Sequence, residues 1–129
     1  MNSTILSKVE KIKSDSDYLA GEIASQLNNS ESFFEENEIQ LLKFHGTYQQ
    51  FDRDTATKLK KKGLEKEFSF MIRTRIPGGV LNFQQYIELD NLANEFSDSS
   101  LRITTRQTFQ FHGVLKKNLK KTISNISKM

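Results

Sequence analysis

The sequence predicts an α+β fold, because stretches with the two-residue period of strands alternate with stretches that have the period of helices. Residues 68–76 and 101–112 alternate apolar and polar side chains, as strands with one buried face do. Residues 82–96 and 115–126 place apolar side chains at intervals of three or four. Together these stretches, spread over about sixty residues, predict an α+β half-domain.

Length and composition restrict the class of protein. The chain of 129 residues suits one domain. No stretch approaches the ~20 apolar residues that span a bilayer, and the first residues become charged before any apolar run forms. We therefore expect a cytoplasmic protein without a membrane segment. The chain has no Cys and two His at unrelated positions, so disulfides and thiolate-bound clusters are excluded and no metal site is expected.

Charge is unevenly distributed along the chain. Residues 1–40 carry eight acidic residues and three lysines, whereas residues 41–129 carry 16 basic and eight acidic residues. A basic half suits nucleic acid, an anionic cofactor or an acidic partner, and it is also typical of a solvated surface. Residues 58–66 (KLKKKGLEK) lack the interleaved aromatic residues of a nucleic-acid platform, so they are interpreted as a solvated helix end or connector.

Residues 1–62 are expected to form an N-terminal leader of helices and a loop. Ile5, Val9 and Ile12 predict a first short helix. A second helix is predicted from Ser14 or Asp15 to residue 27, and residues 28–30 end it. Its apolar side is expected to carry Tyr18, Leu19, Ile23 and Leu27. Residues 32–38 are expected to be an irregular acidic segment and residues 39–44 a short strand.

Residues 45–54 (HGTYQQFDRD) are too polar for a core and are predicted to form a loop. A loop rich in hydrogen-bonding side chains is a candidate for lining a site. His45 has the pKa class that suits proton transfer, although a structural role is the commoner one for a single histidine.

The strand predicted at residues 68–76 presents two different faces. Phe68, Phe70, Ile72 and Ile76 are expected to point to the core, while Arg73 and Arg75 point the other way. Pro77 and two glycines end the strand. Asn82 and Gln85 are expected to form a capping pair at the start of a helix that buries Tyr86, Leu89, Ala93 and Phe96.

Residues 101–112 (LRITTRQTFQFH) carry hydrogen-bond donors at every even position. These positions are Arg102, Thr104, Arg106, Thr108, Gln110 and His112. Ten residues of strand span roughly 33 Å, so a turn or bulge is predicted near residues 105–107. A solvent-exposed strand face is the commoner explanation of such a pattern, but guanidinium groups are also suited to binding carboxylates or phosphates. We expect Arg73 of the first strand to converge with Arg102 and Arg106 in one anion site.

The last predicted helix has Leu115, Leu119, Ile123 and Ile126 on its apolar side. Its lysines are expected on the other, solvated side; they are Lys116, Lys117, Lys120 and Lys121.

Several motifs resemble one family. Residues 70–80 (FMIRTRIPGGV), 101–114 (LRITTRQTFQFHGV) and 115–120 (LKKNLK) resemble the N-terminal half of siroheme-dependent sulfite reductases. Residues 16–24 (SDYLAGEIA) and 41–54 resemble the leader of the same family, closer to the bacterial NADPH-type haemoprotein beta subunit than to ferredoxin-type enzymes. QTFQFHG favours sulfite over nitrite reductases. Phe51 departs from the family, which has an acidic residue there.

This resemblance implies a ferredoxin-like nitrite/sulfite reductase half-domain at residues 63–129, behind the leader. It implies six-electron reduction of sulfite to sulfide in sulfur assimilation and cysteine biosynthesis, at a siroheme coupled to a [4Fe–4S] cluster. By their places in the motifs, Arg73 and Arg102 are expected to be catalytic. Siroheme contacts are expected from Arg73, Arg102, Thr104, Arg106, Gln110 and His112. The expected cavity lining is His45, Tyr48 and Gln49.

The implied partners are sulfite, an electron-donating NADPH-type flavoprotein or ferredoxin, and the C-terminal half of the reductase. The family's cluster cysteines lie downstream of the residues matched here. We therefore expect an N-terminal fragment of the reductase that is inactive alone. A nitrite reductase fragment, a non-catalytic anion- or tetrapyrrole-binding module, and a basic adaptor for nucleic acid or an acidic protein stay open as alternatives.

Overall fold

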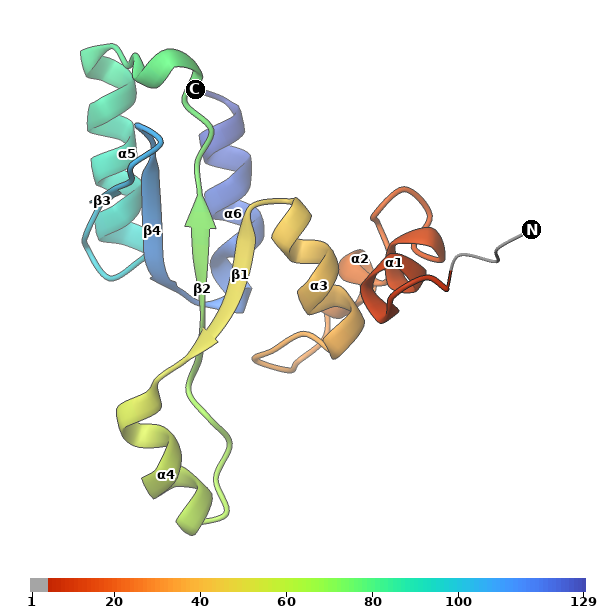
Figure 1. Cartoon of the computed structure of the whole chain (residues 1–129). Helices are drawn as coiled ribbons and strands as arrows, with labels where there is room; N and C mark the ends of the chain where they lie inside the picture. The colour runs from red at the N-terminus through yellow and green to blue at the C-terminus, as the bar shows by residue number, and fades with distance from the viewer. Residues whose placement is uncertain (1–4) are drawn as a thin grey trace.

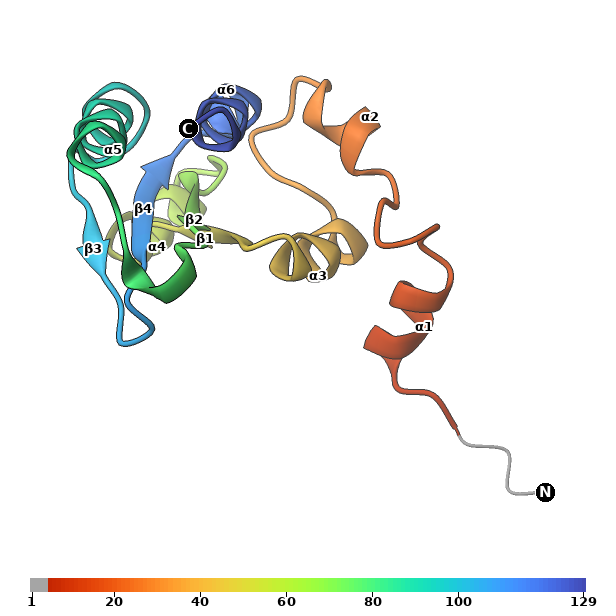
Figure 2. The same cartoon turned by 90° about the horizontal axis from the view of Figure 1, so that it is seen from above.

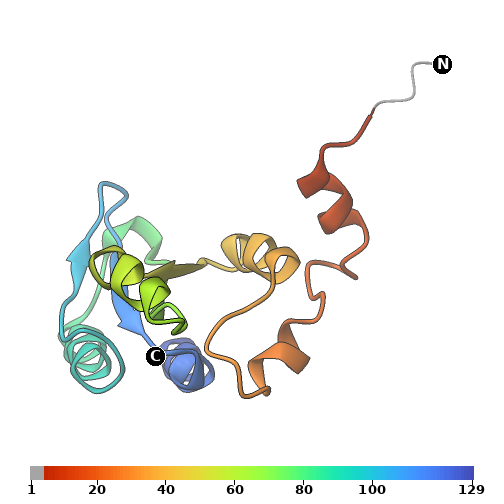
Figure 3. The same ribbon diagram turned by 90° about the horizontal axis from the view of Figure 1, so that it is seen from below.

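A four-stranded antiparallel sheet organises the protein, which is described here by a computed structural model covering residues 5–129. Its strands are β1 (Thr47–Phe51), β2 (Phe68–Arg73), β3 (Arg102–Ile103) and β4 (Phe109–Val114), in the spatial order β1-β2-β4-β3. The helices α5 (Phe83–Phe96) and α6 (Lys116–Ser127) both cover one face of the sheet, as the two end views show (Figures 2 and 3). This arrangement is the predicted α+β fold.

The remaining helices lie outside that sandwich. The helices α1 (Lys8–Ser14), α2 (Ile23–Leu27) and α3 (Glu36–Phe44) follow one another beyond the β1 side of the sheet (Figure 1). The helix α4 (Arg53–Lys61) projects from the end of β1 and has no buried residue. The helices α5 and α6 therefore occupy one face of the sheet that carries the arginines of β2 and β3, and they leave its second face uncovered (Figures 2 and 3). No helix among residues 5–129 is long and apolar enough to cross a membrane.

The core lies between the sheet and the two covering helices. Its buried members from the half-domain are Phe70, Ile72, Leu89, Leu92, Ala93, Phe111, Val114 and Leu119. Phe34, from the segment between α2 and α3, joins them and meets the Phe70 ring edge-on at a centroid distance of 5.6 Å. Burying each large side chain contributes roughly 1.5–3 kcal/mol, so this layer fixes which face of β2 and β4 is left polar.

The predicted capping pair at the start of α5 is confirmed. The Asn82 side chain accepts a hydrogen bond from the Gln85 backbone N–H at 2.8 Å, and the Gln85 side chain accepts one from the Asn82 N–H at 3.1 Å. Leu89 and Ala93 are buried as expected, but Tyr86 is 50% exposed. That part of the prediction was wrong because α5 turns Tyr86 to the edge of the core, where its ring lies 6.2 Å from the ring of the partly buried Phe109.

Residues 32–44 differ from the prediction of an irregular segment and a strand. They contain the helix α3, which buries Glu38, Leu41 and Leu42 at helical spacing. Acidic side chains in the first turn favour the helix through its dipole. Six residues (IQLLKF) are too short a run for periodicity to separate a strand from a helix.

The second helix was also predicted at the wrong length. Asp17, Tyr18 and Leu19 have φ values of 49°, 57° and 68°, and only Ile23–Leu27 is helical. Ser16 stabilises this turn, because its hydroxyl accepts the Leu19 N–H and its carbonyl accepts the Gly21 N–H. Tyr18, expected on an apolar side, is 98% exposed as a result.

The polar stretch after His45 is a strand, not the predicted loop. β1 pairs with β2 along its whole length, from Thr47 opposite Ile72 to Phe51 opposite Phe68. Asp52 then caps α4 by accepting the Asp54 N–H at 2.8 Å. The leader thus contributes a strand to the sheet of the half-domain.

Lys116 was expected to be solvated and is instead buried, with 5% of its surface exposed. Its ammonium group donates to Asn29 Oδ1 at 2.6 Å and to the carbonyl oxygens of Glu31 and Phe33 at 3.0 and 2.9 Å. Burial is the main cause that lowers the pKa of Lys116, and the nearby Glu31 opposes it. Lys116 therefore ties the segment before α3 to the first turn of α6.

Candidate anion-binding site

The sheet register places three predicted site residues in one row. Arg73 of β2 is opposite Gln110 of β4, and Arg102 of β3 is opposite the same Gln110. Directly opposed residues of antiparallel strands point to the same face. Because Ile72 and Phe111 are buried under α5 and α6, that face is the one the two helices leave uncovered. We call this row, Arg73–Gln110–Arg102, the polar row.

The turn predicted near residues 105–107 is confirmed. The Thr104 N–H donates to the Thr108 carbonyl at 2.9 Å, and Gln107 adopts a φ of 56°. The Thr104 hydroxyl accepts from the backbone N–H groups of Arg106 and Thr108 at 3.3 and 3.4 Å. Thr104, expected to contact a cofactor, thus stabilises the turn. Arg106 takes part in these hydrogen bonds through its backbone N–H, and its side chain is exposed.

A buried threonine pair joins this turn to the end of β2. The Thr74 and Thr108 hydroxyls lie 2.8 Å apart, and the Thr108 hydroxyl also donates to the Thr74 carbonyl. The Thr74 hydroxyl accepts the Phe109 N–H at 3.2 Å. The residues flanking this pair are Arg73, Arg75 and, two positions before Thr108, Arg106. The pair therefore fixes the spacing of guanidinium groups that come from two separate segments.

These arginines border one groove of about 430 Å³. It is lined by Phe44, His45, Gly46, Arg73, Thr74, Arg75, Ile76, Arg106 and Thr108. The His45 Nε2 atom lies 2.9 Å from the Leu19 carbonyl oxygen, which ties the groove wall to the turn before α2. An anion in this groove would meet guanidinium groups from β2 and from the β3–β4 turn.

Arg73 has a polar atom that the protein does not satisfy. Its Nε–H is shielded from solvent and has no hydrogen-bond partner within residues 5–129. Its guanidinium carbon lies 5.4 Å from the centre of the Tyr48 ring, a cation–π contact that orients the side chain. A buried donor without an acceptor costs about 1–3 kcal/mol, so Arg73 carries an unsatisfied donor at the groove.

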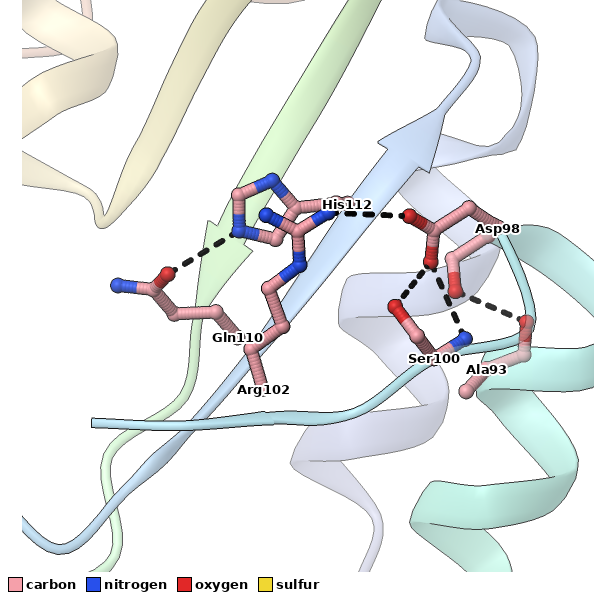
Figure 4. A network of polar contacts seen from close by, with 7 residues as sticks. Ala93, Asp98, Ser100, Arg102, Gln110 and His112 are labelled. Atoms are coloured by element: carbon pink, nitrogen blue, oxygen red, sulfur yellow. Dashed lines mark hydrogen bonds and ion pairs between the residues drawn. The ribbon is translucent and has the colours of Figure 1, made fainter.

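The other end of the polar row is an ion-pair network, seen in Figure 4. The Arg102 guanidinium lies 3.6 Å from Asp98 Oδ2, and His112 Nε2 lies 3.1 Å from Gln110 Oε1. Burial is the first cause that lowers the pKa of His112, and the Arg102 charge lowers it further against the opposing Asp98. At neutral pH His112 is therefore a neutral hydrogen-bonding group.

A β-bulge brings Asp98 to this network. The pairing of β2 and β4 shifts by one residue between Ile72–Phe111 and Phe70–Val114, with the extra residue at His112–Gly113. Gly113 has a φ of 73°, and a Cβ atom there would lie 3.1 Å from the Asp98 Cβ. The Asp98 N–H donates to the His112 carbonyl at 2.8 Å. Glycine thus permits the close approach of Asp98 to β4.

The structure brings most, but not all, of the expected residues together. Arg73, Arg102, Gln110, His112 and Tyr48 share the uncovered face, and Arg106 and His45 line the groove beside it. Gln49 does not, because it alternates with Tyr48 along β1 and its Oε1 accepts the Phe34 N–H at 2.7 Å on the core side. Gln49 therefore binds the segment between α2 and α3 and does not line the cavity.

Sequence reasoning missed some contributors. Arg75 lines the groove although only Arg73 was singled out, and the alternation in MIRTR already placed both on one face. Nothing in the sequence pattern indicated Asp98, which reaches the site through the bulge. Within residues 5–129 there is no group of three or more His, Asp or Glu residues that could hold a metal ion.

Comparisons with known proteins show the family of the chain. Residues 63–128 match the nitrite/sulfite reductase ferredoxin-like half domain. The chain is 50% identical to the sulfite reductase [ferredoxin] of Synechococcus elongatus over 94% of its length, covering 19% of that protein. It is 45% identical to the sulfite reductase [NADPH] hemoprotein beta-component of Staphylococcus saprophyticus over 95% of its length, covering 22% of that protein. The chain thus spans about a fifth of the length of these relatives.

A solved structure supports the fold. The structure of the Mycobacterium tuberculosis NirA protein superposes with a TM-score of 0.74 at 21% identity, over 95% of this chain and 24% of that one. The matched half domain covers half of the sequence and includes β2, β3, β4, α5 and α6. The chain therefore belongs to the nitrite/sulfite reductase ferredoxin-like half domain family.

Proposed function

We propose that this chain supplies the arginine-rich part of a siroheme and sulfite site in a sulfite reductase. The observation that carries the proposal is the polar row, where two guanidinium groups flank one amide and the Arg73 Nε–H lacks an acceptor. Guanidinium forks bind carboxylates in pairs of hydrogen bonds, which suits the carboxylates at the edge of a siroheme. The sulfite reductases among the relatives support sulfite as the substrate.

The residues present fit siroheme but do not fit an iron–sulfur cluster. The row and the groove together carry the guanidinium groups of Arg73, Arg75, Arg102 and Arg106, and a polycarboxylate requires such positive charge. The chain has no Cys, so the ligands of a [4Fe–4S] cluster would come from elsewhere in the reductase. When bound, siroheme supplies the redox-active iron at which sulfite is reduced.

Each residue has a task in this proposal. Arg73 and Arg102 bind the anionic substrate and the macrocycle edge, and their fixed charges stabilise negative charge on sulfite oxygens. Arg106 reaches across the groove to a further carboxylate. The side-chain N–H groups of Gln110 donate to the ligand between the two arginines, because the Gln110 Oε1 atom is bound by His112. His112, neutral at pH 7, holds Gln110 in that orientation.

The rest of the assembly follows from the relatives and stays with the proposal. The names of the relatives include a ferredoxin-type and an NADPH-type enzyme, so either a ferredoxin or a flavoprotein would donate electrons. The C-terminal half of a reductase would supply the cluster, and the assembled enzyme would work in the cytoplasm. Methyl-viologen-coupled sulfide formation is expected to be absent for the 129-residue chain alone.

Siroheme titration tests the proposal. Purified chain is expected to give a saturable shift of the Soret band, and Arg102→Ala is expected to weaken binding roughly tenfold, as loss of a charge-assisted contact does. The matched control is Arg53→Ala, which removes the same charge from α4. No saturation, or equal weakening by both substitutions, would rule the proposal out. Competition by nitrite and sulfite in the same assay separates the two reductase classes.

A further inference from the structure

We propose that Asp98 is a positioning residue, whose carboxylate holds the Arg102 guanidinium in the polar row. This inference rests on the proposed function, because the benefit of a fixed Arg102 is tighter anion binding. The contacts of Asp98 themselves are present in the ligand-free chain. Asp98 does not contact the groove, and it is absent from the residues that line it. It acts through Arg102, whose guanidinium lies 3.6 Å from Asp98 Oδ2.

Asp98 is itself rigidly held. Its Oδ1 atom accepts the Ser100 N–H at 3.1 Å and the Ser100 hydroxyl at 2.5 Å. Its backbone N–H donates to the His112 carbonyl, and the Cβ lies against Gly113. One oxygen is thus used to fix the carboxylate, which leaves the other oxygen facing Arg102 (Figure 4).

Arg102 needs such support because little else restrains it. It lies in a strand of two residues at the edge of the sheet, and its side chain is 57% exposed. An arginine loses about 2 kcal/mol of rotamer entropy when it is fixed. A guanidinium that is already held beside Gln110 avoids part of this loss when an anion binds.

A second consequence concerns His112. The Arg102 charge and the Asp98 charge act on the His112 ring in opposite directions, so their pairing moderates the effect of Arg102. Removing the carboxylate would leave the effect of the Arg102 charge on His112 without the opposing effect of Asp98. Asp98 therefore influences both the orientation of one donor and the protonation of its neighbour.

A positioning role for Asp98 and a role as a simple negative charge predict opposite effects of Asp98→Asn on anion binding. Asparagine keeps an Oδ1 acceptor for Ser100 and so preserves the local fold, but it presents an amide to Arg102. If Asp98 acted only as a negative charge near an anion site, its loss would strengthen anion binding. If Asp98 positions Arg102, siroheme binding weakens about threefold, the size typical of an exposed ion pair.

The test uses the full chain and nuclear magnetic resonance. In the ligand-free protein, the heteronuclear NOE of the Arg102 Nε–H is expected to fall in D98N towards the value of Arg53, and D98E is expected to restore part of it. The pKa of His112 is expected to fall in D98N. Asp90→Asn, an equal charge change on the exposed side of α5, is expected to change neither quantity.

Two results would overturn the proposal. One is an Arg102 NOE that is the same in D98N as in the unsubstituted chain. The other is siroheme binding that is unchanged or tighter in D98N. If no variant binds siroheme, including the unsubstituted chain, the proposed function fails, and the Arg102 NOE still decides whether Asp98 positions this side chain.

Discussion

Arg73 on β2 and Arg102 on β3 are both opposed to Gln110 on β4, so one row of the sheet carries two guanidinium groups with an amide between them. Adjacent strands are about 4.8 Å apart, which places the two arginines roughly 10 Å from each other across the row. At this spacing the two side chains can bind separate carboxylates of one macrocycle.

Arg73→Met is expected to stabilise the ligand-free chain by about 1 kcal/mol while abolishing tight siroheme binding. The substitution removes a buried donor that has no acceptor and keeps an apolar stem of similar length. Urea denaturation measures the stability, and the Soret titration measures binding. Arg106→Met, at an exposed turn position, is the control and should leave stability unchanged. A loss of stability in R73M would show that Arg73 is satisfied within the protein.

The Thr74–Thr108 pair is expected to show strong coupling in a double-mutant cycle. Each single change to valine should cost about 1–2 kcal/mol, because it removes the bond between the two hydroxyls and the bonds of the lost hydroxyl to the neighbouring backbone. The double variant should cost less than the two single changes together, since both hydroxyls are then gone. Urea denaturation of all four proteins gives the coupling energy. Additive losses would mean that the two hydroxyls do not depend on each other.

Lys116→Met is expected to destabilise the chain by about 2–3 kcal/mol. Three acceptors in the segment before α3 lose the ammonium group that satisfies them. Hydrogen exchange should accelerate selectively at residues 29–34. Lys117→Met, the exposed neighbour on α6, is the control and should change stability by less than 0.5 kcal/mol, roughly the usual range for surface positions. Similar losses of stability in both variants would contradict the role of Lys116 in holding the segment before α3.

Protonation of His112 is expected to destabilise the fold. Its pKa in the folded chain lies below the ordinary histidine value of about 6.5, so the unfolded chain binds this proton first as the pH falls. The contribution of neutral His112 is complete above pH 6.5 and is lost as the pH decreases from there through the lowered pKa of the folded state. His112→Asn should remove this component of the pH dependence. The measurement is unfolding free energy between pH 7.5 and 5 for both proteins; identical slopes would refute it.

The polar row could be predicted because it follows from alternation alone. Arg73 directly follows the core-facing Ile72 in the sequence, so it points to the other face of the strand. Gln110 and Arg102 also alternate with apolar neighbours, so their face could be predicted once the turn at Gln107 was expected. The resemblance to sulfite reductase motifs then led to the ligand that we propose for this face. The fold class was predicted for the same reason, since long amphipathic helices flank both strands.

The rest depended on tertiary contacts that no local pattern contains. Gln49 turned out to face the core side because β1 is a strand, and the polar composition of HGTYQQ concealed that strand. Lys116 lies on the buried stripe with Leu119 and Thr122, but its acceptors come from residues more than eighty positions earlier. Asp98 joins the site only through the bulge at Gly113.

The central claim is that the polar row binds the carboxylates of siroheme, and the Nε–H resonances of the arginines test it most directly. During addition of siroheme to the full chain, the Nε–H signals of Arg73 and Arg102 and the side-chain amide signals of Gln110 are expected to shift or broaden together and to saturate at the same ratio. The Arg53 signal on α4 is expected to stay in place. Signals of the row that do not move, or an Arg53 signal that moves equally, would contradict the account.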